Sequence, residues 1–166
     1  MRAGLAALVA VVLLAWTLPA TAAEWGSIRP GISTTANVRE LYGAPTKSSK
    51  ERVDNYDTET WVYDEPKAPA GLKRLTVEYG LVIAEKYQPN VVRAFRVEPQ
   101  PGGFTRRIII LGWGQPDRAG RDGDTDVFVY YEGMIVYFDE SGQDAKLVLF
   151  TVAQPRDPAD VPAPRR

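Results

Sequence analysis

The chain has 166 residues, with 20 Lys or Arg against 21 Asp or Glu, and its formal net charge is -1. This near-neutral balance gives no basic footprint of the kind that nucleic-acid binding needs. The absence of Cys and His excludes disulfides and thiolate chemistry, and it removes the usual base of catalytic triads and the commonest zinc ligand.

The first 23 residues have the pattern of an export signal. Residues 5–18 form an apolar run, which suits a signal-peptide core and is shorter than the ~20 residues that span a membrane. Pro19 and the small residues after it favour cleavage after Ala23, with Ala22 as the second choice. We therefore expect residues 1–23 to be a cleaved signal peptide, with an uncleaved anchor as the alternative. The remaining chain is expected to be periplasmic or secreted and to have no membrane span.

A short helix is expected after this segment. Thr34 can cap its first turn through the side-chain hydroxyl. Val38, Leu41 and Tyr42 share one face at helical spacing, which predicts an apolar stripe on the core side. Gly43 can close the helix in a left-handed conformation.

Strand-like runs follow this helix, and short turns between them indicate antiparallel pairing. They are residues 59–63, 72–79 and 82–87, with 91–97 as a further strand.

The helix pattern recurs later in the chain at a constant shift of 71 positions, with Thr105 in the place of Thr34 and Gly114 in the place of Gly43. The β-branched run at residues 108–110 opposes a helix there. Strands are expected after it at residues 127–131, 134–138 and 147–152.

These patterns predict an α+β fold of two tandem helix-plus-antiparallel-meander repeats. The first repeat is expected at residues 24–98 and the second at 99–153, with both helices packed on one face of an antiparallel sheet. Residues 154–166 hold four Pro and no apolar periodicity, which predicts a disordered Pro-rich tail.

The first helix and the strand after it carry a family resemblance. The cap followed by V-x-x-L-x-G-x-P, and then by the aromatic strand around Trp61 and Tyr63, resembles the SmpA/OmlA (BamE-like) envelope domain. The residues that carry it are Thr34, Val38, Leu41, Gly43 and Pro45, with Thr105, Ile109, Gly114 and Pro116 in the second copy. In tandem, the pattern resembles the β-lactamase inhibitor protein type of fold.

This resemblance implies an exported bacterial protein that contacts other proteins and performs no chemistry. The outer-membrane assembly members of the family are single-copy lipoproteins, whereas this chain has two copies and no Cys for lipid attachment. The resemblance therefore favours a soluble periplasmic relative over a role in outer-membrane assembly.

The sequence contains no convincing catalytic or metal site. The acidic loop Asp122–Asp126 has the D-x-D-x-D spacing that begins a calcium loop, but Val127 and Gly133 stand where the motif needs Gly and Glu. A solvated loop is the favoured interpretation and a weak cation site the alternative. The carboxylates around Tyr56 lie at turn-like ends, no Ser has a His to activate it, and no S-x-x-K motif occurs. We therefore expect no enzyme, no cofactor and no metal.

The apolar residues of the second half indicate a protein-binding surface. Its strands are apolar on both faces, whereas Arg74, Thr76 and Glu78 mark a solvated face in the first half. An uncovered apolar sheet face is unusual on a monomer, so we expect it to be covered by other parts of the chain, by a partner or by self-association. The predicted partner-binding residues are Phe128, Tyr130, Ile135, Tyr137, Trp61 and Tyr63.

The leading hypothesis is therefore a non-catalytic exported module that binds a protein of the cell envelope. One alternative is an inhibitor of an exported hydrolase, which would present residues 48–58 or 117–126 as a protruding loop. The other is a carrier of a small apolar ligand, which would need a cavity.

Overall fold

The computed structural model describes residues 23–153. The expected signal segment up to residue 22 and the expected tail at 154–166 lie outside the described residues. Ala23 is buried, and its N–H donates to the Glu132 carbonyl at 2.7 Å. Cleavage after Ala23 would remove this contact, whereas cleavage after Ala22 would keep it. Within residues 23–153, no helix is long and apolar enough to cross a membrane.

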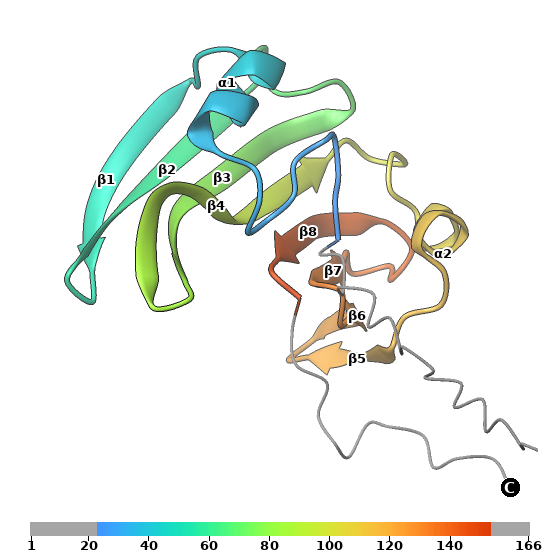
Figure 1. Cartoon of the computed structure of the whole chain (residues 1–166). Helices are drawn as coiled ribbons and strands as arrows, with labels where there is room; N and C mark the ends of the chain where they lie inside the picture. Colours follow the sequence, from blue (N-terminus) through green and yellow to red (C-terminus); the bar gives the residue numbers. More distant parts are fainter. Residues whose placement is uncertain (1–22, 154–166) are drawn as a thin grey trace, which may run out of the picture.

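The described chain is an antiparallel sheet with two short helices (Figure 1). The helices are α1 (Thr35–Tyr42) and α2 (Arg106–Trp113). The strands are β1 (Lys47–Val53), β2 (Tyr56–Asp64), β3 (Leu72–Ile83), β4 (Lys86–Pro99), β5 (Arg118–Asp122), β6 (Thr125–Tyr130), β7 (Met134–Phe138) and β8 (Ala145–Thr151). All eight strands belong to one sheet in the order β1-β2-β3-β4-β8-β7-β6-β5.

The predicted architecture of two tandem helix-plus-meander repeats is therefore wrong. The strand expected at 91–97 is part of β4, a 14-residue strand, and residues 94–97 of β4 pair with β8. This pairing merges all the strands into a single sheet. Strands β1 and β5 were not predicted, because every residue of these two edge strands is exposed and neither has an apolar alternation.

Both helices begin and end where the sequence predicts. The Thr34 hydroxyl accepts the Asn37 N–H, and the Thr105 hydroxyl accepts the Ile108 N–H. Gly43 and Gly114 follow the helices with φ of 73° and 81°, which a side chain would oppose. Residues 108–110 are helical despite their β-branched side chains. The cap and the complete burial of Ile109 outweigh the modest propensity cost.

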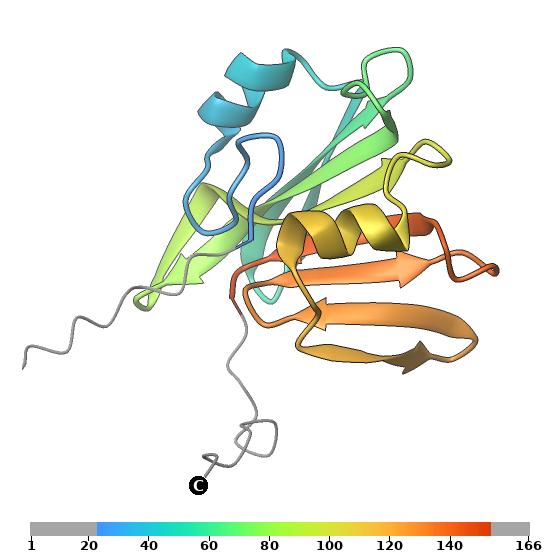
Figure 2. The ribbon, with the colours of Figure 1, turned by 90° about the vertical axis from the view of Figure 1, so that its right-hand side faces the viewer.

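One face of the sheet, called the inner face below, carries the core. Two rows of apolar side chains cross the sheet on this face in register, and they are Trp61-Val77-Phe95-Phe150-Met134-Tyr130 and Tyr63-Leu75-Val97-Val148-Val136-Phe128. All of these side chains are buried. Both helices pack on this face, since Tyr42 contacts the Tyr63 ring and Trp113 contacts the Phe150 ring. Figure 2 shows α2 in front of the second-half sheet, with its axis running roughly along the strands.

Two inner-face tyrosines tie the helices to the sheet. The Tyr63 hydroxyl donates to the Gly43 carbonyl at 3.1 Å, and the Tyr130 hydroxyl donates to the Gly114 carbonyl at 3.0 Å. Each bond gives a partner to a carbonyl just past the end of a helix, where backbone carbonyls lack intrahelical donors. These hydroxyls therefore fix where each helix ends over the sheet.

The substitution Tyr130→Phe is expected to lower the free energy of unfolding by about 1 kcal/mol, because it removes the hydrogen bond and leaves the Gly114 carbonyl without it. The matched control is Tyr137→Phe, since the Tyr137 hydroxyl makes no hydrogen bond to residues 23–153. Urea unfolding of both variants measures the difference. Equal stabilities of the two variants would contradict this role of Tyr130.

Alkaline pH should destabilise the protein through the same tyrosines. Burial raises the pKa of Tyr63 to about 12, against 10.0 for an ordinary tyrosine, and it also raises the pKa of Tyr130. The folded state holds these protons more tightly than the unfolded chain, so their contribution is intact below pH 10 and is lost as pH rises towards 12. The free energy of unfolding should fall over this interval, and less steeply in Tyr63→Phe. An unchanged slope in that variant would refute the assignment.

Candidate protein-binding surface

The face of the sheet opposite the helices, called the outer face below, is divided into a charged half and an apolar half. Over β2–β4 it carries charges that pair with one another. Asp64 contacts Arg74 at 2.5 Å, and Glu78 contacts Arg93 at 2.9 Å and Arg96 at 2.5 Å. This half therefore presents a polar surface whose main charges already have partners.

Over β6–β8 the outer face is apolar apart from its end beside the β5–β6 turn, where the Lys146 ammonium donates to the Thr125 hydroxyl at 3.1 Å. Two in-register rows cross these strands, and we call them together the outer patch: Val127-Tyr137-Leu147 and Val129-Ile135-Leu149. All six side chains are partly exposed. Both helices pack on the inner face, so neither covers the patch. An apolar sheet face that no helix of residues 23–153 covers is a feature that isolated monomers rarely show.

The structure separates the six predicted binding residues between the two faces. Trp61, Tyr63, Phe128 and Tyr130 lie in the core on the inner face, and each is at most 7% exposed. Only Ile135 and Tyr137 belong to the outer patch. The prediction that Phe128 and Tyr130 belong to the same binding surface as Ile135 and Tyr137 is therefore wrong. The sheet pairs Ile135 with Val129, and it places Phe128 opposite Val136.

The other four members of the patch are not among the residues predicted to bind a partner. Val127 and Val129 alternate with the core residues of β6, and Leu147 and Leu149 do so in β8. This alternation is visible in the sequence. Assigning the two alternating sets to faces requires the pairing between strands, which the sequence does not contain.

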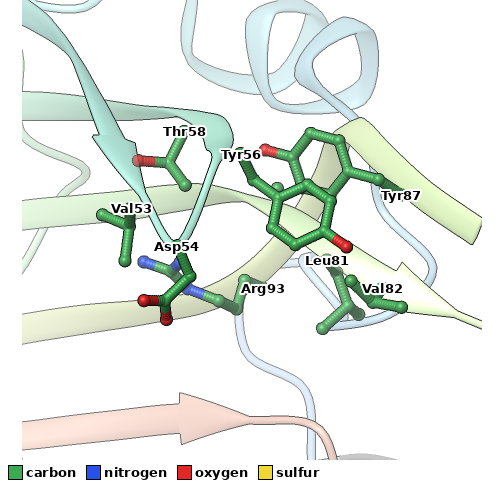
Figure 3. Close-up of a pocket in the computed structure, with 9 residues that line it drawn as sticks. Val53, Asp54, Tyr56, Thr58, Leu81, Val82, Tyr87 and Arg93 are labelled. Atoms are coloured by element: carbon green, nitrogen blue, oxygen red, sulfur yellow. The ribbon is translucent and has the colours of Figure 1, made fainter. Parts of the chain in front are cut away.

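A small pocket opens where the β1–β2 and β3–β4 hairpins end, with a volume of about 250 Å³. Its residues are Val53, Asp54, Tyr56, Thr58, Gly80, Leu81, Val82, Tyr87 and Arg93. Figure 3 shows the rings of Tyr56 and Tyr87 on one side and Asp54 and Arg93 on the other. The rings stack with centroids 4.5 Å apart. The volume is below the range of typical small-molecule sites and suits a single protruding side chain.

Tyr87 holds the pocket wall in place. Its hydroxyl donates to the Asp57 carbonyl on β2, which links the two hairpins. Gly80 allows this approach, because it has a φ of +101° and a Cβ there would lie 2.3 Å from the Tyr87 hydroxyl oxygen. The 48–58 segment, one of the two candidate inhibitory loops, is the paired hairpin on the other side of this pocket.

The acidic segment Asp122–Asp126, within the other candidate loop, forms the turn of the β5–β6 hairpin. Asp126 contacts Arg106 at 3.0 Å and Arg121 at 3.5 Å, so arginines occupy its carboxylate. Arg106 also lies over the rings of Phe128 and Phe138. Within residues 23–153, no cluster of acidic side chains is arranged to hold a metal ion.

No family model matches the chain, and no curated protein matches it significantly. Two solved structures are similar. The crystal structure of a DUF4309 family protein (YjgB) from Bacillus subtilis subsp. subtilis str. 168 is 16% identical with a TM-score of 0.47, over 76% of this chain and 82% of that one. An extracellular protein containing a SCP domain from Bacillus anthracis str. Ames is 11% identical with a TM-score of 0.45, over 83% of this chain. The match spans 55% of the latter protein. At these TM-scores neither likeness supports an argument about function.

The substitution Gly80→Ala is expected to destabilise the protein by more than about 1 kcal/mol and to separate the Tyr56 and Tyr87 rings, because it adds a Cβ at a positive φ and against Tyr87. Urea unfolding and the ring-proton chemical shifts measure the two effects. Gly112→Ala is the comparison, since its added Cβ would meet no atom of residues 23–153 within 4 Å beyond its chain neighbours and the backbone of α2, and it should stabilise α2 by up to about 1 kcal/mol. Unchanged ring shifts in Gly80→Ala would contradict the packing described for Tyr87.

Proposed function

We propose that this protein is an exported, non-catalytic module that binds another protein through the outer patch. The observation that carries the proposal is the contrast across one sheet face. Over β2–β4 the charged side chains of the outer face form ion pairs with one another, whereas over β6–β8 six apolar side chains remain partly exposed. Burial of such a patch against a partner is favourable in proportion to the apolar area removed from water.

The layout of the patch fits a protein partner. Tyr137 lies on the middle strand of the patch, between Val127 and Leu147, and tyrosine is enriched among the residues that dominate binding energy. Charged residues border the patch, with Arg96 on β4 opposite Leu149 and Arg118 on β5 opposite Val129. An apolar centre with a polar rim is the usual anatomy of a protein interface.

Export is supported by the signal-peptide pattern of residues 1–23. The resemblance to the SmpA/OmlA envelope domain would imply an exported protein that binds other proteins without catalysis. The carrier alternative has less support, because the pockets at the hairpin ends and beside α2, of about 250 and 320 Å³, are small and open. One observation supports the inhibitor alternative: the apolar side chains of Val53 and Tyr56 are exposed beside the β1–β2 turn.

The double substitution Ile135→Asp with Tyr137→Asp tests the proposal, because it places charge at the centre of the patch without touching the core. Partners are captured from an envelope extract on the wild-type protein, purified and titrated against each variant. The double variant should bind at least tenfold more weakly, a loss of ~1.4 kcal/mol, while its melting temperature stays close to that of the wild type.

The matched control is Thr60→Asp with Thr76→Asp, on the charged half of the same face. This control should bind as the wild type does. Undiminished binding by the patch variant, or an equal loss in the control, would refute the proposal.

A further inference from the structure

Strand β5 forms one edge of the sheet. Its five residues, Arg118–Asp122, are all exposed, and within residues 23–153 no strand lies along its outer side. The backbone N–H and C=O groups along such an edge can pair with a strand of another chain.

The sequence of β5 is complementary to itself in antiparallel pairing. Around a two-fold axis at Gly120, all five residues pair, and Arg118 of each copy lies opposite Asp122 of the other. Both side chains lie on the outer face, since they pair with Val129 and Thr125 of β6. Opposite charges directly across an antiparallel pair stabilise it, and the symmetry makes this contact twice.

The remaining residues of β5 place no like charges in opposition. On the inner face Ala119 lies opposite Arg121 of the second copy, and Arg121 keeps its ion pair with Asp126 of its own chain. At the axis Gly120 meets itself, and apart from its two chain neighbours no atom of residues 23–153 lies within 4 Å of the position of a Cβ there.

The other edge of the sheet lacks this complementarity. Strand β1, Lys47–Val53, is also fully exposed. Its full-length pairing with a second copy is centred on Lys50, which places two ammonium groups opposite each other at the axis. Like charges directly opposed in a strand pair are destabilising. The two edges therefore differ in how they receive a second copy.

We propose that two copies of this protein associate in solution through antiparallel pairing of their β5 strands. The two sheets then form one continuous sheet, with both outer patches on the same face. The net charge of -1 opposes this association little. The inference uses the sheet edge and is independent of the proposed partner surface.

Sedimentation velocity across a wide concentration range tests the dimer. The wild type should form a dimer. The single variants Arg118→Asp and Asp122→Arg should each lower the affinity of the dimer at least tenfold, because each places like charges directly opposite each other at two symmetry-related positions. The double variant R118D/D122R reverses both charges and should restore the dimer. Arg107→Asp, which makes the same change of net charge as Arg118→Asp at an exposed position of α2, is the control and should leave the dimer intact.

Three results would overturn the inference: a wild type that is monomeric at all concentrations, a double variant that stays as weak as the single ones, and assembly beyond a dimer. The Ile135→Asp/Tyr137→Asp variant separates the two proposals, because an edge-paired dimer should persist in it. Loss of the dimer in that variant would assign self-association to the outer patch and overturn pairing through β5.

Discussion

The pairing of β4 with β8 is the contact on which the rest of the structure depends. At this junction the rings of Phe95 and Phe150 stack with centroids 4.5 Å apart and an interplanar angle of 11°. Both rings are completely buried, and Trp113 of α2 packs against Phe150. The junction joins four strands on each side into a single sheet, and it lets the inner-face core run without interruption from Trp61 to Tyr130.

Within residues 23–153 the two short helices cover only one face of the single sheet. The apolar side chains of the inner face lie beneath α1 and α2, and the outer face has to be compatible with water or with a partner. Over β2–β4 it is compatible with water, because arginines and carboxylates pair there. Over β6–β8 the outer patch has no such charges. The fold itself assigns no function, so this patch carries the functional proposal.

Local features were predictable because they depend on neighbouring residues. Thr34, Gly43, Thr105 and Gly114 marked both helices correctly, since caps and helix ends are set by hydrogen bonds within a few residues. The single sheet was not predictable, because the register between β4 and β8 joins residues more than 50 positions apart. The same missing register misplaced Phe128 and Tyr130 on the binding surface. The edge strands were missed because their exposed polar residues have no periodic pattern.

The central claim is that the outer face of β6–β8 is open to solvent while the inner face is closed. Methyl NMR with a soluble paramagnetic probe tests it on residues of the same strands. The account predicts strong broadening of the Ile135 and Leu149 methyl signals and little broadening for Val136 and Val148, which are at most 1% exposed. Equal protection of all four would mean that the patch is covered within the monomer or in a stable assembly, and it would contradict the account.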